Sequence, residues 1–311
     1  MGSEPEAQDE VWPIIWCYDG WLPLKERLQR ILPPWAALRV LDPSRPLSEQ
    51  CADAKVLIPT TGPVDAAAIY AAADLRLIAQ PAAGYANIAV DAARQRGVPV
   101  TIAPGLNCHS TAEVALMLIL MLARRADDVR AAFARRVIGD PVGTELHGKT
   151  LGIVGMGQVG SCLAAAARGL GMHVIGVGSK SSRADLEALL SGSDVISLHC
   201  HSTPQTRGMI GAAELALMRP RALLVNTARG DVIDDAALLE ALQAGRLGGV
   251  GLDVHTVEPA DPEAPLYKHP KVLALPHCGN TTEEVYARNA ELLRDNIVAA
   301  REGTELRHRL C

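Results

Sequence analysis

The stretch Thr150-Leu-Gly-Ile-Val154-Gly155-Met-Gly157-Gln-Val-Gly160 decides the fold class of this chain. Its first five residues form an apolar run typical of a buried strand, and the residues after Gly160 continue as a helix. Gly155 permits a tight turn, Gly157 lets a pyrophosphate approach the backbone, and Gly160 allows the helix to pack closely on the strand. Free amides at the start of that helix favour an anion. The stretch therefore predicts a dinucleotide-binding unit.

Short β-rich runs alternate with helical stretches on both sides of this segment, which is typical of parallel α/β units. The strands expected in the second half are residues 150–154, 173–177, 194–199, 222–226, 249–254 and 272–275, with helices at about 159–170, 184–190, 212–218 and 235–244. The strands expected in the first third are 38–41, 55–59, 75–79 and 99–103, with helices at 64–73 and 88–96.

The 311 residues exceed what one hydrophobic core usually supports, so two domains are expected. We expect an α/β protein with two doubly wound parallel-sheet domains. A Rossmann cofactor domain at 104–280 would be inserted in a flavodoxin-like substrate domain made of 1–103 and 281–311. The helix at 110–125 is apolar nearly all round, which indicates burial between domains. The amphipathic helix at 282–301 would return to the first domain.

Composition excludes several classes of protein. The net charge is −5 without a basic block, which argues against a nucleic-acid partner. The longest apolar run, 114–123, is half of a membrane span, and the acidic N-terminus is unlike a signal peptide. The seven cysteines are scattered and show no C-x-x-C spacing, so neither disulfides nor a metal site is expected. We therefore expect a cytoplasmic protein with reduced thiols and no membrane partner.

The segment after the second strand of the dinucleotide unit bears on cofactor choice. A NAD-binding unit normally carries an acidic residue there, which hydrogen-bonds the ribose. This chain instead has Ser179, Lys180, Ser181 and Arg183. Hydroxyls and cations suit a 2′-phosphate, so NADP(H) is predicted to be preferred, with NAD(H) possible. The alternative is that this stretch is an ordinary solvated loop.

Three later segments place Arg229, Glu258 and His277 after strands, at the edge where parallel sheets bind ligands. A guanidinium, a carboxylate and an imidazole at this edge can bind a 2-oxo acid and exchange a proton with its oxygen. Glu258 would favour a charged His277. Alone, each residue has a plainer interpretation: a salt-bridged arginine, a solvated acid and a strand-end histidine.

In these segments the chain resembles the D-isomer-specific 2-hydroxyacid dehydrogenase family, which includes glyoxylate/hydroxypyruvate reductases and phosphoglycerate dehydrogenase. The resemblance runs from about residue 55 to 300 and is carried, in order, by 155–160, 193–200, 203–208, 226–230, 253–258 and Pro276-His277. It implies that Arg229 binds the substrate carboxylate and carbonyl, that His277 is the acid/base, and that Glu258 pairs with His277.

The resemblance also implies the residues that line the two ligands. Those along the cofactor would be Gln158, Val159, Cys200, Thr206, Thr227, Ala228, Arg229, Asp253, His277 and Gly279, with Asp253 at the nicotinamide carboxamide. On the substrate side, the family's glycine-rich loop matches residues 80–87, where Ala82 replaces a usual glycine. The amides of Ala83 and Gly84, together with Tyr85 and Asn107, would join Arg229 and His277 around the substrate. A structural role for Tyr85 is equally open.

The sequence thus predicts an NAD(P)-dependent oxidoreductase that transfers hydride between NADP(H) and a small 2-oxo or D-2-hydroxy acid, of the glyoxylate or hydroxypyruvate type. Two alternatives share the fold: a dinucleotide-sensing binding protein that resembles a corepressor, and a formate- or phosphite-type dehydrogenase. The presence of Glu258 disfavours the formate type. The resemblance further implies a homodimer, in which residues 110–136 embrace the partner.

Overall fold

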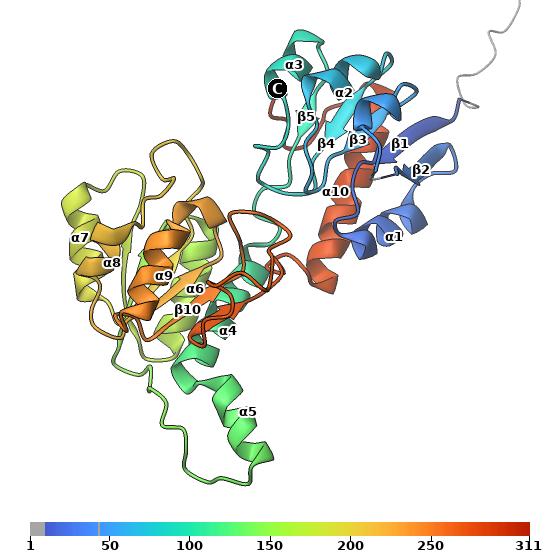
Figure 1. Cartoon of the computed structure of the whole chain (residues 1–311). Helices are drawn as coiled ribbons and strands as arrows, with labels where there is room; N and C mark the ends of the chain where they lie inside the picture. The colour runs from blue at the N-terminus through green and yellow to red at the C-terminus, as the bar shows by residue number, and fades with distance from the viewer. Residues whose placement is uncertain (1–9, 43) are drawn as a thin grey trace, which may run out of the picture. The chain divides into compact units, whose positions relative to one another are not determined.

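The computed structural model describes residues 10–42 and 44–311, which form two units (Figure 1). The described residues up to Leu106, together with Thr281–Cys311, make the first unit, and Asn107–Asn280 make the second. The chain passes from one unit to the other three residues later than the predicted boundary at 103/104.

The first unit is built on a parallel sheet with strand order β2-β1-β3-β4-β5, the flavodoxin-like order. Its strands are β1 (Trp12–Trp16), β2 (Ala36–Val40), β3 (Val56–Ile58), β4 (Leu77–Ala79) and β5 (Val100–Thr101). Its helices are α1 (Leu22–Ile31), α2 (Ala66–Ala71), α3 (Val90–Gln95) and α10 (Glu283–Glu302), with a 3-10 turn at Leu47–Glu49.

The structure contains strand β1 and helix α1, which the sequence analysis did not predict. The short run Trp12-Pro-Ile-Ile-Trp16 contains a proline, which normally demotes a candidate strand. Pro13 is tolerated because it lies near the start of β1, whose residues from Ile14 to Trp16 are fully buried between β2 and β3. The burial of these large side chains stabilises β1 by more than Pro13 destabilises it.

The end of the chain completes the first unit. Helix α10 packs against α1 and β4. Beyond it, the backbone N–H of Leu310 donates to the carbonyl of Val100 at 2.7 Å, and Arg309 forms an antiparallel bridge with Thr101. The C-terminal residues, to which the sequence assigned no role, therefore cover the outer edge of β5.

The second unit has six parallel strands in the order β11-β10-β9-β8-β6-β7. They are β6 (Thr150–Val154), β7 (His173–Val177), β8 (Val195–Leu198), β9 (Leu223–Asn226), β10 (Gly249–Leu252) and β11 (Val272–Ala274). The helices α6 (Gln158–Gly169), α7 (Arg183–Gly192), α8 (Ala212–Leu217) and α9 (Asp235–Gln243) connect them, with a 3-10 turn at Gly230–Val232. The strand order reverses between β6 and β8, which is where such sheets bind ligands. The predicted α/β class with two parallel sheets is confirmed.

Helix α4 (Cys108–Arg124) precedes this sheet and continues into α5 (Ala126–Ala134). It packs against α6, β9 and β10 of its own unit, but Met117 and Leu120 are 39% and 38% exposed. The face of α4 that carries these two residues is therefore partly exposed, although the helix is apolar nearly all round. Arg125 adopts a left-handed conformation, with φ at 52°, which ends α4 before α5 begins. Among the residues that the structure describes, no helix has the length and apolarity that crossing a membrane would need.

Candidate active site

The glycine loop between β6 and α6 has the shape that an anion site needs. Gly155 has φ at +105°, and a Cβ there would lie 2.6 Å from the carbonyl carbon of His199. At Gly160 a Cβ would lie 2.2 Å from the carbonyl oxygen of Gly155, whereas a Cβ at Gly157 would meet open space. No side chain caps α6, so its first backbone N–H groups remain available. The loop fits a dinucleotide pyrophosphate held at Gly157 and the start of α6.

The cationic residues after β7 differ in how they are engaged. Arg183 donates to Glu187 at 2.8 Å and also forms an ion pair with Glu214, so its charge is already compensated. Lys180 is exposed and has no ion-pair partner in the described part of the chain. Ser181 accepts a hydrogen bond from the N–H of Gly178 at 3.1 Å and shapes the turn. Lys180 is therefore the cation that remains available for a phosphate, and Ser179 is exposed beside it.

The residues after β8 form a hydrogen-bonded turn at the same edge of the sheet. The Thr206 hydroxyl donates to the carbonyl of His201 at 2.6 Å and accepts from the N–H of Thr203. Cys200 is half-buried, and burial raises the pKa of its thiol. Burial also disfavours the charged form of His199 and lowers its pKa to about 4. The neutral ring is hydrogen-bonded to the hydroxyls of Ser197 and Thr227.

Arg229 is presented by a turn that the Asn226 side chain fixes. The carbonyl oxygen of this side chain accepts from the N–H of Ala228 at 3.0 Å, and its amide donates to the carbonyl of Arg229 at 2.8 Å. The exposed guanidinium donates to the carbonyl of Ala228 and has no carboxylate partner among residues 10–42 and 44–311. At Gly230 a Cβ would lie 1.9 Å from the carbonyl carbon of His255. The Arg229 turn therefore lies directly against the loop that leads to Glu258.

Glu258 and His277 form a close pair. The imidazole Nδ1 lies 2.7 Å from Glu258 Oε2, and each side chain is about one-third exposed. Glu258 Oε1 accepts from the backbone N–H of His255 at 3.0 Å. Burial acts to raise the pKa of Glu258, but the hydrogen bond and charge of His277 and the His255 N–H outweigh it, so this pKa is lowered. Glu258 is therefore a carboxylate at neutral pH.

The loop that carries His277 is held on both sides. His277 has φ at 55°, a strained conformation for a histidine. The carboxylate of Asp253, which is 1% exposed, accepts from the N–H groups of Cys278 and Gly279 at 2.8 and 2.9 Å. The Ser110 and Thr111 hydroxyls donate to the carbonyl of Gly279. These contacts fix the backbone that orients the imidazole of His277. Both carboxylate oxygens of Asp253 accept hydrogen bonds from this loop.

The structure adds His255 and Tyr267 to the surroundings of this pair. His255 Nε2 donates to the carbonyl of Leu275 at 2.8 Å, and Nδ1 is hydrogen-bonded to the Tyr267 hydroxyl at 3.1 Å. The two rings meet edge to face at 5.0 Å. His255 thus supports the loops of Glu258 and His277 through packing. Tyr267 lies between β10 and β11 in a segment without a recognisable pattern, which is why the sequence did not indicate it.

Burial raises the pKa of Cys278 to about 12, with the carboxylate of Asp253 as a further cause. The thiol is therefore protonated, and it contacts Asp253 at 3.3 Å. Cys278 has no nucleophilic role in this state, in agreement with its interpretation as a small hydrophobic residue.

The expected substrate loop lies in the first unit and is fixed by two amides. Gln80 Nε2 donates to the carbonyl of Gly84 at 2.8 Å and to Asn87 Oδ1 at 3.2 Å, and Asn87 in turn donates to Gly62. Ala83 lies on this loop. Asn107 is the N-cap residue of α4 in the second unit and makes no capping bond.

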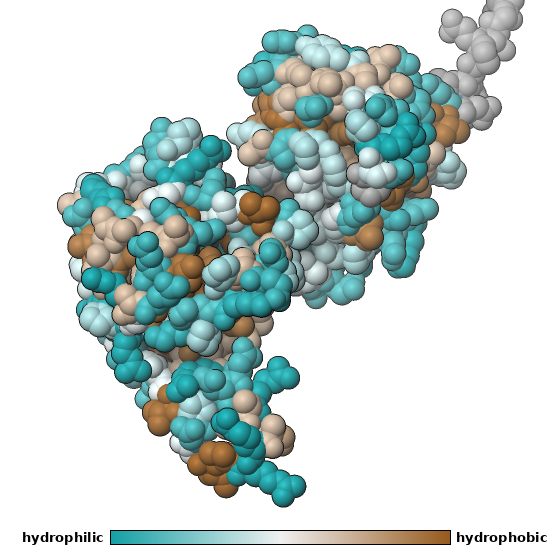
Figure 2. All heavy atoms as spheres, in the orientation of Figure 1, coloured by the Kyte–Doolittle hydropathy of each residue, from teal (hydrophilic) through white to brown (hydrophobic). Residues whose placement is uncertain are grey.

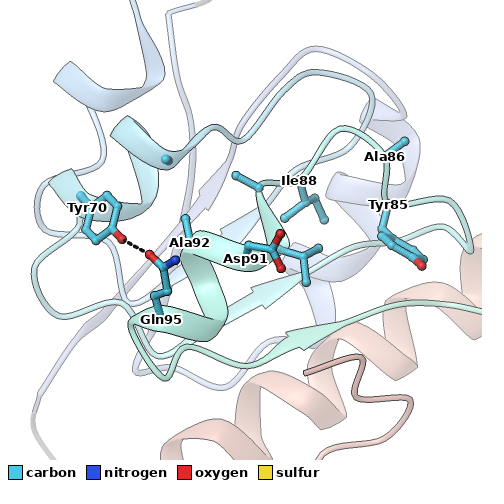
Figure 3. A pocket seen from close by; sticks show the side chains of 10 residues that line it. Tyr70, Tyr85, Ala86, Ile88, Asp91, Ala92 and Gln95 are labelled. Carbon is cyan, nitrogen blue, oxygen red and sulfur yellow. Dashed lines mark hydrogen bonds between the residues drawn. The ribbon is translucent and has the colours of Figure 1, made fainter.

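Tyr85 lies on that loop and lines a pocket of about 510 Å³ in the first unit (Figure 3). The Tyr70 hydroxyl donates to Gln95 Oε1 at 3.0 Å on its other side. Asp91 is the one charged residue that lines this pocket. A carboxylate there repels an organic acid, so this pocket does not suit a 2-oxo acid.

The glycine loop at the switch point, with an uncompensated arginine and a Glu–His pair at the same edge of the sheet, defines the class of a dinucleotide-dependent oxidoreductase. The model of the NAD binding domain of D-isomer specific 2-hydroxyacid dehydrogenases matches residues 116–279. Glyoxylate reductase of Korarchaeum cryptofilum is 40% identical over 260 residues, 78% of each chain. Glyoxylate/hydroxypyruvate reductase B of Yersinia enterocolitica is 37% identical over 81% of this chain and 82% of its own. The chain belongs to the D-isomer specific 2-hydroxyacid dehydrogenase family.

Solved structures agree with this assignment. The TT0316 protein from Thermus thermophilus is 34% identical, with a TM-score of 0.86 over 97% of this chain and 100% of its own. A glyoxylate reductase from Paecilomyes thermophila is 30% identical, with a TM-score of 0.81 over 97% and 98%. The chain is therefore an oxidoreductase of this family that uses a nicotinamide dinucleotide.

Proposed function

We propose that this enzyme reduces a small 2-oxo acid, glyoxylate or hydroxypyruvate, to the D-2-hydroxy acid, with Arg229, Glu258 and His277 as its catalytic residues. The observation that carries this proposal is the 2.7 Å contact between His277 Nδ1 and Glu258 at the edge where Arg229 is uncompensated. The names of the relatives, glyoxylate reductase and glyoxylate/hydroxypyruvate reductase, support the choice of substrate.

The residues would divide the reaction as follows. Arg229 binds the substrate carboxylate and polarises the carbonyl, because a guanidinium offers two parallel donors. His277 gives a proton from Nε2 to the oxygen that gains negative charge, while Glu258 holds Nδ1 and stabilises the imidazolium. The bound nicotinamide supplies the hydride. Gly157 and the start of α6 hold the pyrophosphate, and Ala83, Gly84, Tyr85 and Asn107 are the proposed residues of the substrate side.

NADP(H) is the proposed preferred cofactor. In the segment after β7, Lys180 is exposed and has no ion-pair partner among the residues that the structure describes, and no carboxylate stands at the end of that strand. The first acid, Asp185, is engaged in the capping box of α7 with Ser182. Of the two cations predicted for the 2′-phosphate, Lys180 is the stronger candidate, since Arg183 is held by Glu187 and Glu214.

A panel of 2-oxo acids assayed with NADPH and NADH in parallel tests both proposals. We expect glyoxylate and hydroxypyruvate to give the highest kcat/KM, and NADPH to exceed NADH. Lys180→Ala should lower kcat/KM for NADPH about tenfold and leave NADH unchanged, because one charge-assisted contact is worth roughly 1.5 kcal/mol. Arg183→Ala is the comparison variant and should lower kcat/KM for NADPH less than Lys180→Ala does, because Arg183 is held by Glu187 and Glu214. A tenfold preference for NADH would contradict the cofactor proposal, and no turnover with any 2-oxo acid would favour the dinucleotide-sensing alternative.

A homodimer formed through α5 and the segment after it is also proposed. This segment exposes Phe133, Ile138 and Val142 at 85%, 98% and 79%. Figure 2 shows hydrophobic atoms gathered where α5 projects, and the N–H of Thr144 returns to the carbonyl of Ala123 at 2.7 Å. The projecting segment is therefore anchored at both ends, and a second copy of the chain would cover its apolar side chains.

Light scattering should give the mass of a dimer for the wild type and about half that mass for the double variant Phe133→Asp, Ile138→Asp. Buried carboxylates would carry a desolvation penalty at the interface, whereas both positions are exposed in a single chain. Leu217→Asp, on the exposed end of α8, is the control and should leave the mass unchanged. A dimer that persists in the double variant would place the interface elsewhere.

A further inference from the structure

Two cysteines and a histidine that the proposed reaction does not use meet where α4 and α6 pack together. Cys108 and His109 are the first two residues of α4, and Cys162 lies one turn into α6. Their ligand atoms, two thiol sulfurs and one imidazole nitrogen, all lie within 4.8 Å of one another. The sequence does not reveal this cluster, because the packing of α4 against α6 brings together residues that are far apart in the chain.

The scaffold beneath the cluster is well packed. Helices α4 and α6 contact each other directly (Figure 1), through the buried residues Ala112, Ala115, Leu163 and Ala167. Small alanine side chains let the helix axes approach closely. The three ligand atoms are therefore presented by regular helices, which hold a coordination geometry better than loops do.

The same three groups are available to a ligand. His109 is exposed, and its ring makes no hydrogen bond within the described part of the chain. Cys108 and Cys162 are both half-buried free thiols. The neighbouring hydroxyls of Ser110 and Thr111 are already used by the carbonyl of Gly279. The two thiol sulfurs lie within 4.8 Å of each other and of the His109 ring nitrogen.

We propose that Cys108, His109 and Cys162 form a binding site for a soft or borderline metal ion of the Zn²⁺ class. Thiolate and imidazole ligands suit Zn²⁺, whereas Mg²⁺ and Ca²⁺ require oxygen ligands. With Zn–S bonds of about 2.3 Å, a tetrahedral site places its sulfurs about 3.8 Å apart, so the 4.8 Å cluster needs only a contraction of about 1 Å. Three protein ligands leave the fourth position to water. This proposed site goes beyond the proposed reaction and differs from the expectation, drawn from the sequence, of no metal site.

Titration of the reduced, metal-free full chain with Zn²⁺ and with Co²⁺ tests the proposal. We expect one ion per chain, with the thiolate-to-cobalt charge-transfer absorption that sulfur ligands produce. Because the ion links α4 to α6 and binds only the folded chain, saturating Zn²⁺ should raise Tm by several degrees. Cys108→Ser and Cys162→Ser should each weaken Zn²⁺ binding at least a hundredfold, and His109→Ala about tenfold.

Cys311→Ser is the matched control, since Cys311 is a half-buried thiol in the first unit, and it should leave Zn²⁺ binding unchanged. A second measurement on the wild type covers a variant that fails to fold: Zn²⁺ should protect Cys108 and Cys162, but not Cys311, from alkylation by iodoacetamide. Unchanged binding in Cys162→Ser, no stoichiometric binding in the wild type, or equal alkylation of all three thiols with and without Zn²⁺ would each overturn the proposal.

Discussion

His277→Ala should lower kcat for reduction of a 2-oxo acid at least about a hundredfold, because general acid catalysis by a positioned imidazole contributes about that much or more. The imidazole is held by Glu258 at 2.7 Å, and a loop fixed by Asp253, Ser110 and Thr111 positions it. Removing the ring leaves the backbone contacts of this loop in place. The KM of the substrate should therefore change much less than kcat.

The pH dependence separates an acid role from a structural one. Reduction consumes a proton, so kcat of the wild type should fall as pH rises when a protein group donates that proton, and this fall should vanish in His277→Ala. Since the pKa of Glu258 is lowered, its carboxylate persists to pH values where an ordinary glutamate takes up a proton. On the acid side, the carboxylate contribution to the pair is lost as pH falls through that lowered pKa. Glu258→Gln should keep a hydrogen-bond acceptor for Nδ1 but lower kcat, because the negative charge beside the imidazole is gone.

His173→Ala is the matched control for this experiment. His173 is exposed at the start of β7, which is the opposite edge of the sheet from His277. Its replacement should leave kcat and the pH profile unchanged. Near-wild-type turnover in His277→Ala would remove the acid role from this residue.

Local pattern predicted most of the second unit. Strands β6 and β7 have the bounds that were expected, because each is a continuous apolar run between a helical stretch and a glycine or polar break. Strand β1 was not predicted because Pro13 interrupts the usual composition of a strand. The strand is stabilised by its burial between β2 and β3. Periodicity within one segment reports how that segment prefers to fold, but it does not report which neighbours will cover it.

The site shows the same division between local and tertiary information. Gly155 and Gly160 are required by close backbone approaches that the motif itself indicates. In contrast, the compensation of Arg183 by Glu214 depends on the packing of α7 beside α8, and the proximity of Cys108 to Cys162 depends on the packing of α4 against α6. Pairs of this kind join residues that share no spacing rule, so a single sequence does not reveal them.

Arg229→Ala should lower kcat/KM for the 2-oxo acid by about a hundredfold to a thousandfold, through both a higher KM and a lower kcat. The guanidinium is exposed and uncompensated by any carboxylate of the described residues, so its charge is available to the substrate anion. Losing its two-point contact removes binding energy, and it also removes the orientation of the carbonyl toward the proton donor. KM for the cofactor should change less, because the glycine loop lies after a different strand.

Arg229→Lys tests whether geometry or charge carries this effect. Lysine keeps the positive charge but loses the planar pair of donors, so kcat/KM should remain well below the wild-type value while exceeding that of Arg229→Ala. Arg246→Ala is the control, since Arg246 is exposed, lies before β10 and has no ion pair within the described residues. If Arg229→Lys restores full activity, the substrate is held by charge alone. If Arg229→Ala keeps the kcat/KM of Arg246→Ala, the substrate carboxylate binds elsewhere, because removing the Arg229 guanidinium would then have cost no binding energy.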